Sequence, residues 1–204
     1  MRSLTIALVL LAASVHSARA SQADISVYSD LAGLTCPTAQ PLAPTTWYVL
    51  ATTFSEACAG VTGAEFRLDG FPTAADGWFL IPTAPDGINV EGDPFGDGVR
   101  LSGPACRTSE QGVVLLLKLT VVPLPGVPVV DRPVHVAAHR VPTDPQFSCP
   151  VLRLCDASAI CVRGGFTRIN AFSFCPCQFE CGPAPCPPLA VERQAWSALK
   201  RLYD

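Results

Sequence analysis

The cysteines are the residues of this chain with the clearest capacity for chemistry. Four of them fall within "CPCQFECGPAPCPP" (175–188). Thiolates spaced this closely can bind zinc, act as a redox dithiol, or pair as disulfides. Which of these applies depends on the compartment that the chain reaches. The ten cysteines are Cys36, Cys58, Cys106, Cys149, Cys155, Cys161, Cys175, Cys177, Cys181 and Cys186.

The first twenty residues have the features of a secretory signal peptide. Arg2 provides a positive start, residues 4–15 are apolar, and "ARA" at 18–20 precedes a cleavage point at Ser21. The apolar run is shorter than the roughly 20 residues that span a bilayer. No later stretch is apolar for long enough to anchor the chain. We therefore expect an exported protein (secreted, periplasmic or on the cell surface) with no membrane span once the signal is removed.

Disulfides are the state that this compartment favours for the thiols. An even number of cysteines behind a signal peptide indicates a disulfide framework. A zinc site would need reduced thiolates, which an exported compartment does not favour. Cys175-Pro-Cys177 is a C-x-C sequence rather than the redox C-x-x-C, and no βαβ pattern surrounds it. We expect all ten cysteines to pair, and no cofactor.

An acidic stretch, "APDGINVEGDPFGDG" (84–98), is the best metal candidate. Its carboxylates are hard oxygen ligands and its glycines permit tight turns, which suits calcium. Asp-Gly and Asp-Pro also form turns that need no ion. His135 and His139 do not make a second candidate, because four residues of a strand span roughly 13 Å. The weak calcium candidates are Asp86, Glu91, Asp93 and Asp97.

Aromatic residues suggest a possible ligand site, while catalytic motifs are missing from the sequence. Trp47, Trp78 and Phe95 are weak candidates for a glycan-stacking platform, with Trp78 the most exposed because it follows Gly77 at a strand start. Aromatic residues in strand patterns also commonly form the core. The chain has no G-x-S-x-G or H-E-x-x-H motif. Its 17 acidic residues include no pair that stands out for carboxylate catalysis.

Short strands separated by proline and glycine fill residues 24–172. The chain has 20 prolines and 15 glycines, and hardly any stretch keeps a helical period. "GVVLLLKLTVVP" (112–123) is apolar on both faces, as a central strand should be. These patterns predict an all-β fold, an antiparallel β-sandwich of about nine strands. The predicted strands are 24–30, 45–54, 63–71, 77–83, 87–92, 98–103, 112–123, 132–142 and 166–172.

Two stretches carry a resemblance to known domains. "GVTGAEFRLDGFP" followed later by "GVVLLLKLTV" resembles the core of cohesin-like, immunoglobulin-like jelly rolls. The full layout resembles uncharacterised secreted bacterial cysteine-rich proteins, which begin with a "DI-x-V-Y" strand. The first resemblance implies a β-sandwich with a protein partner, which for cohesins is a dockerin, and the second implies no known activity. The closing tail of the second group is matched here by Val191, Glu192, Trp196, Lys200, Leu202 and Tyr203.

Strand direction narrows the disulfide pairing. Cys36 and Cys58 flank the strand at 45–54, which separates them by roughly 30 Å, so they cannot be partners. If successive strands alternate in direction, Cys106 returns to the Cys58 end and those two form a pair. The same alternation brings Cys175 or Cys177 to Cys36. The remaining cysteines would then close local loops at 149–161 and 181–186.

The last sixteen residues, "LAVERQAWSALKRLYD" (189–204), have the pattern of an amphipathic helix. Its apolar face would either pack on the sandwich or dock a partner. The predicted organisation is a signal peptide at 1–20, a β-sandwich at 21–174, a Cys/Pro-rich segment at 175–188 and this helix at 189–204. The candidate partner-docking residues are Trp196, Leu199, Leu202 and Tyr203.

Composition limits the function. The formal charge of −3 becomes −5 when Arg2 and Arg19 leave with the signal peptide, and no basic run remains to bind nucleic acid. Our leading hypothesis is a non-catalytic exported protein, a surface, adhesion or protein-interaction module, and not an enzyme. The alternatives are a carbohydrate-binding module with a cell-surface glycan as its partner and, third, a secreted hydrolase that uses carboxylates.

Overall fold

The computed structural model describes residues 23–53, 60–107, 113–126 and 131–170. The predicted signal peptide, Cys58, the Cys/Pro-rich segment and the C-terminal helix lie outside these residues. The described chain forms strands in two sheets, with one short 3₁₀ helix, η1 (Ala74–Asp76). Within this part there is no helix with the length and hydropathy to cross a membrane.

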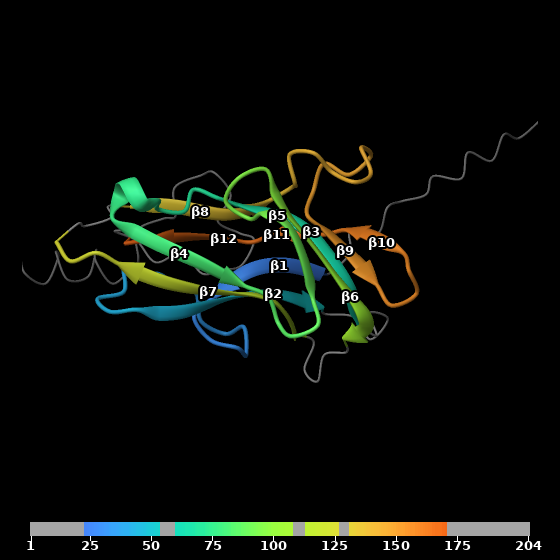
Figure 1. Ribbon diagram of the computed structural model, residues 1–204, viewed down its shortest axis with the longest axis horizontal. Coiled ribbons are helices and arrows are strands. Elements are labelled where there is room, and N and C mark those ends of the chain that lie inside the picture. Colours follow the sequence, from blue (N-terminus) through green and yellow to red (C-terminus); the bar gives the residue numbers. More distant parts are fainter. Residues whose placement is uncertain (1–22, 54–59, 108–112, 127–130, 171–204) are drawn as a thin grey trace, which may run out of the picture.

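The first sheet has the strand order β11-β1-β2-β7-β4. All its neighbours are antiparallel except β1 and β11. β7 lies between β2 and β4 and is apolar apart from Lys118 and Thr120 (Figure 1). The strands are β1 (Ala23–Tyr28), β2 (Thr45–Thr53), β4 (Trp78–Thr83), β7 (Val113–Pro123) and β11 (Arg163–Gly164).

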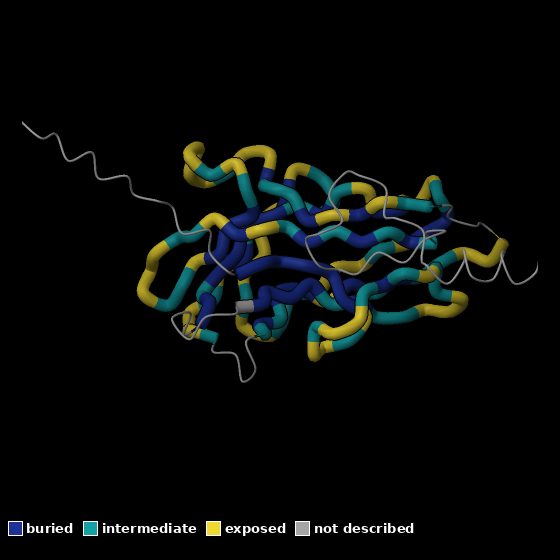
Figure 2. The backbone as a smooth tube through the Cα atoms, turned by 180° about the vertical axis from the view of Figure 1, so that it is seen from behind, coloured by how far each residue is buried: buried dark blue, intermediate teal, exposed yellow. Residues whose placement is uncertain are grey.

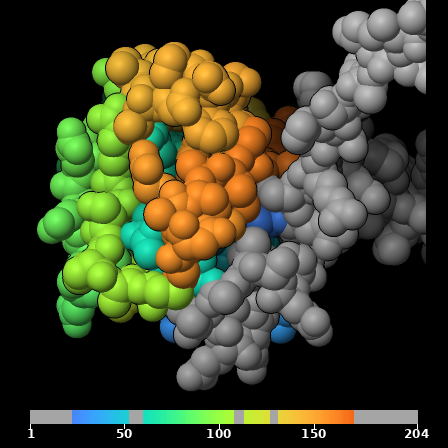
Figure 3. Space-filling view, turned by 90° about the vertical axis from the view of Figure 1, so that its right-hand side faces the viewer, coloured from blue at the N-terminus to red at the C-terminus, as the bar shows by residue number. Residues whose placement is uncertain are grey.

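The second sheet is built around β3, which has neighbours on both sides. β6 pairs with one edge, while β9 pairs with the first half of β3 and β8 with its last residues. Seen from one end, the residues of β3 (teal) lie between those of β5 and β6 (green) and those of β9 and β10 (orange; Figure 3). The strands are β3 (Val61–Asp69), β5 (Asn89–Asp93), β6 (Gly98–Arg107), β8 (Arg132–Ala137), β9 (Val151–Leu154), β10 (Ala159–Cys161) and β12 (Phe166–Ile169).

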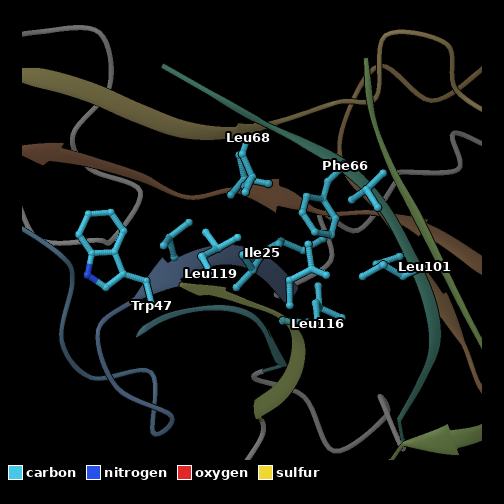
Figure 4. Packing of buried hydrophobic residues seen from close by; sticks show 14 of the residues in the cluster. Ile25, Trp47, Phe66, Leu68, Leu101, Leu116 and Leu119 are labelled. Atoms are coloured by element: carbon cyan, nitrogen blue, oxygen red, sulfur yellow. The ribbon is translucent and has the colours of Figure 1, made fainter. Parts of the chain in front are cut away.

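The core fills the space between the two sheets. Alternation along β3 turns Phe66 and Leu68 inward, where they face Ile25 and Leu119 of the first sheet (Figure 4). Burying one such side chain contributes about 2 kcal/mol, and this term holds the layers together. Buried residues follow the strands, and exposed residues gather in the loops (Figure 2).

The predicted fold class is confirmed: the chain is an antiparallel β-sandwich stapled by disulfides. All nine predicted strands are present, but the one predicted for 132–142 ends at Ala137 and the one predicted for 98–103 continues to Arg107. β9, β10 and β11 were not predicted. These strands have two to four residues each, too few for an alternating pattern to emerge.

Two disulfides lie wholly within the described residues. Cys106–Cys155 joins β6 to the residue after β9, with Cα atoms 5.3 Å apart, and Cys149–Cys161 closes the β9–β10 hairpin, with Cα atoms 5.7 Å apart. Cys36 is also disulfide-bonded, and its partner lies outside the described residues. The pairing of Cys36 with Cys175 or Cys177 therefore stays a prediction.

The predicted Cys58–Cys106 bond is wrong, and the missed strand β9 explains why. Val61 at the start of β3 is in register with Arg107 of β6 and with Leu154 of β9. The residues beside these two partners, Cys106 and Cys155, therefore meet at the same end of β3. Sequence alternation located that end but not the second strand that reaches it.

Candidate functional site

A cleft of about 460 Å³ opens between the end of β3 and the start of β4. This volume lies in the range of ligand-binding pockets. Four separate parts of the chain form its walls: β3 with the loop that follows, β4, the β5–β6 turn and the segment after β8. The lining residues are Leu68, Asp69, Gly70, Phe71, Pro72, Thr73, Ala74, Trp78, Phe79, Leu80, Phe95 and Arg140.

Aromatic rings form one side of the cleft. The rings of Phe71 and Phe95 lie 5.6 Å apart between centroids. Behind them Trp47 packs 6.3 Å from Phe71 and 5.8 Å from Trp78, in tilted arrangements typical of aromatic clusters. Phe95 is only partly buried, and Phe79, which also lines the cleft, is 47% exposed. The cleft therefore offers a rigid apolar surface.

A turn at Gly70 brings Phe71 into this cluster. Gly70 has φ +78°, a left-handed conformation that glycine adopts at little cost, and a Cβ there would overlap the carbonyl oxygen of Pro133. The strand predicted for 63–71 instead ends at Asp69. Phe71 was not predicted as a site residue, because the alternation of a strand does not predict where a side chain points after the chain has turned.

The polar rim of the cleft consists of paired charges. The Arg67 guanidinium donates two hydrogen bonds of 2.6 Å to the Asp69 carboxylate. These bonds lower the pKa of Asp69, and the nearby His135 acts in the same direction. Asp69 therefore stays ionised and its oxygens are already engaged. Arg140 lies 3.7 Å from Asp97, and both side chains are largely exposed.

The strand edge beside the cleft is open. Within the described residues β4 pairs only with β7. Gly77 accepts a hydrogen bond from Leu124 N at 2.7 Å, so alternation directs the N–H and C=O groups of Leu80 away from β7. Pro82, the next position facing outward, has no N–H to donate. At this edge, Leu80 is therefore the residue whose backbone can both donate and accept a hydrogen bond with an added strand.

The predicted aromatic platform is wrong, although its residues do come together. Trp78 is 1% exposed and Trp47 3% exposed, so neither presents a face to solvent. Trp78 was expected to be exposed because it follows a glycine. Instead Gly77 forms the left-handed cap of η1, after which β4 starts with Trp78 directed into the core.

The calcium candidates do not form a site in the described part of the chain, where no group of three metal-binding side chains occurs. Asp93 accepts a hydrogen bond from Phe95 N at 3.0 Å, so it forms the β5–β6 turn. Glu91 lies 3.7 Å from Arg100, and Asp97 is beside Arg140. The turn-forming alternative is therefore the one that the contacts support.

The two histidines do not both lie on the strand predicted for 132–142. β8 ends at Ala137, and only His135 lies on it, 3.5 Å from Asp69. His139 is buried, and its Nδ1 accepts a hydrogen bond from Val141 N. It packs against Gly98, where any Cβ would lie 2.5 Å from the imidazole.

A buried carboxyl lies on β1. Asp24 is 2% exposed, its Oδ1 has no hydrogen-bond partner, and its register neighbours are Thr52 and Arg163. Burial raises the pKa of Asp24 to about 7, although attraction to Arg163 opposes this rise. The folded chain therefore holds a proton on Asp24 more tightly than the unfolded chain does.

Replacing Asp24 with asparagine is expected to stabilise the fold at neutral and higher pH. The wild type loses stability as pH rises from the ordinary pKa of 3.8 to about 7, because the unfolded chain ionises Asp24 freely over this range while burial keeps the acid protonated in the folded chain. Asparagine has no such proton. In thermal unfolding from about pH 4 to about pH 8, the melting temperature of the variant should gain a few degrees over wild type, at about 2–4 °C per kcal/mol. A gap that stays constant with pH would contradict a buried acid here.

Solved cohesin modules resemble the chain with TM-scores below 0.5. No protein-family model matches the chain, and no curated protein matches it. A cohesin module from a Clostridium perfringens family 33 glycoside hydrolase has 11% identity and a TM-score of 0.47, over 74% of this chain and 98% of that one. A type I cohesin of Clostridium thermocellum, solved with a dockerin, has 11% identity and a TM-score of 0.44, over 76% and 98%. A type III cohesin of Ruminococcus flavefaciens has 11% identity and a TM-score of 0.40, over 74% and 89%.

Proposed function

We propose that this protein is an exported, non-catalytic protein-binding module, acting at a surface or in adhesion, whose partner places an apolar side chain in the cleft beside β4. The observation that carries this proposal is the aromatic wall of Phe71 and Phe95 next to the open edge at Leu80. Buried apolar pockets of this kind hold the anchor residues that dominate protein interfaces. The outward N–H and C=O of Leu80 suit an extended partner segment.

The charges of the cleft favour binding over hydrolysis. Asp69 is the only carboxylate among the described lining residues, and Arg67 occupies both of its oxygens. Its lowered pKa removes it as a general acid near neutral pH. Glycoside hydrolysis needs two carboxylates across one site, and the lining supplies one.

The surroundings of the cleft favour a protein over a glycan. The two tryptophans that could stack on a sugar are buried. The cleft lining is mostly apolar or aromatic, which suits the apolar contacts at the centre of a protein interface. Disulfides also fit a module that works in an oxidising, extracytoplasmic compartment.

Selection of short random peptides displayed on phage against the mature chain tests the site. We expect enriched peptides to carry an apolar residue in an extended sequence. Phe95→Ser should weaken their binding by at least about tenfold, since loss of an anchor contact costs more than about 1.4 kcal/mol. Fluorescence anisotropy with labelled peptides measures the dissociation constant.

Val90→Ser is the matched control, because Val90 lies in the same β5–β6 hairpin but is 48% exposed and does not line the cleft. It should leave peptide affinity unchanged. Failure to enrich any peptide, or equal binding to Phe95→Ser and wild type, would count against the proposal. Glycan-array binding that disappears in Phe95→Ser would instead make the chain a carbohydrate-binding module.

A further inference from the structure

Four apolar side chains form a strip on the outer side of the first sheet: Phe79, Ile81, Val122 and Leu124. Phe79 is 47% exposed, Ile81 54% and Leu124 43%, while Val122 is partly buried. Phe79 is in register with Val122, so the two strands present their apolar residues side by side. We call these residues the β4 strip.

The β4 strip departs from the usual pattern of a sheet with one face in water. Such a face normally carries polar residues, opposite the apolar core face. None of the four strip residues is polar, although Thr120 of β7 lies opposite Ile81. The nearest charge on β7 in this direction, Lys118, lies opposite Thr83 at the far end of β4. Exposed apolar patches of this kind mark surfaces that bind something.

The described chain ends close to this strip. Ile169, the last residue of β12, is in register with Arg132, which donates a hydrogen bond of 2.8 Å to Asp76 of η1. η1 leads directly into β4, and Gly77 after it bonds to Leu124. β12 therefore ends at the same end of the sandwich as the start of β4 and the end of β7, although it belongs to the other sheet (Figure 1).

The chain continues from there into the segment 189–204. We propose that this segment packs on the β4 strip of its own chain, with Trp196 and Leu199 against Phe79 and Ile81. Residues 171–188 extend to about 60 Å at most, which is ample for this short path. A lone helix of this length is marginal in water, so its apolar face needs a surface. Phe79 also lines the cleft, so the docked segment would lie beside the proposed partner site.

Hydrogen–deuterium exchange of the mature chain tests the docking. In wild type, the amides of 189–204 should be protected. Ile81→Asp places a charge in the strip and should speed their exchange by at least about tenfold, because a locally opened segment loses its protection. Val90→Asp introduces the same charge at a position of similar exposure on the other sheet and should leave exchange unchanged.

A second variant tests the same contact without altering the sandwich. Leu199→Asp should release the segment and raise hydroxyl-radical labelling of Phe79, while labelling of Val90 stays constant. Unchanged exchange in Ile81→Asp together with unchanged labelling of Phe79 in Leu199→Asp would overturn the proposal. Protection of 189–204 that rises with protein concentration would also overturn it, since a second copy would then occupy the strip.

Discussion

Replacing Cys106 and Cys155 together by alanine is expected to lower the free energy of unfolding by about 4 kcal/mol. The bond closes a loop of 49 residues, and the entropy that it removes from the unfolded chain grows with the length of that loop. It also ties together β6 and β9, the two strands that flank the start of β3. Urea unfolding, with the m-value fitted separately for each variant, measures the loss.

The Cys149–Cys161 bond provides the control for this prediction. Its loop spans only 12 residues within the β9–β10 hairpin, so removing both cysteines should cost about 3 kcal/mol. Both double variants avoid leaving a free thiol. A larger cost for the hairpin bond than for Cys106–Cys155 would show that loop length does not govern these staples.

Gly60 lies against the same disulfide bond. A Cβ at Gly60 would lie 2.8 Å from Cys106 Sγ and 2.9 Å from Cys155 Sγ, closer than any relaxed contact. The disulfide therefore passes directly over the residue that precedes β3. This close approach is why the position holds a residue without a side chain.

Gly165→Ala is expected to be among the costliest single substitutions, at about 3 kcal/mol or more. Gly165 N donates to Ile25 O at 2.7 Å and Gly165 O accepts from Val136 N at 2.9 Å, so this residue bridges β1 of one sheet and β8 of the other. A methyl group there would overlap Ser26. Because backbone holds the residue on both sides, it cannot move aside.

Two further variants separate the clash from the general cost of losing a glycine. Gly87→Ala meets no atom within 4 Å but has φ +74°, so it should cost only about 1 kcal/mol of backbone strain. Ser26→Gly combined with Gly165→Ala should be less destabilising than the sum of the two single changes. If the losses of stability from the two single changes simply add in the double variant, a clash with Ser26 is not the cause of the cost at Gly165.

The strands follow from the sequence because their signal is local. The alternation of Phe66 and Leu68 with charged neighbours on β3, and the doubly apolar β7, each depend on a few adjacent residues. They were enough to predict the layers and the buried position of β7. The short strands β9 to β11 carry no such pattern, since their pairing depends on β3 and β1 rather than on their own residues.

The cleft could be predicted only in part. The sequence predicts Trp47, Trp78 and Phe95 as one group. In the structure, Trp47 packs on Trp78, and Trp78 and Phe95 both line the cleft. Alternation assigns residues to two faces of a strand but does not say which face meets the other sheet. Trp78 therefore proved to be core, and of the three predicted residues only Phe95 is partly exposed.

By itself, the sequence determined that this chain forms a disulfide-stapled β-sandwich, because strand periodicity and turn residues act over a few neighbouring positions. Tertiary structure alone decided that Cys106 bonds Cys155, because that pair depends on two strands meeting at Val61 from distant parts of the chain. It likewise decided that Gly70 turns Phe71 towards Phe95 to form the cleft. Both are contacts across the fold, and no local pattern specifies which distant partner a residue meets.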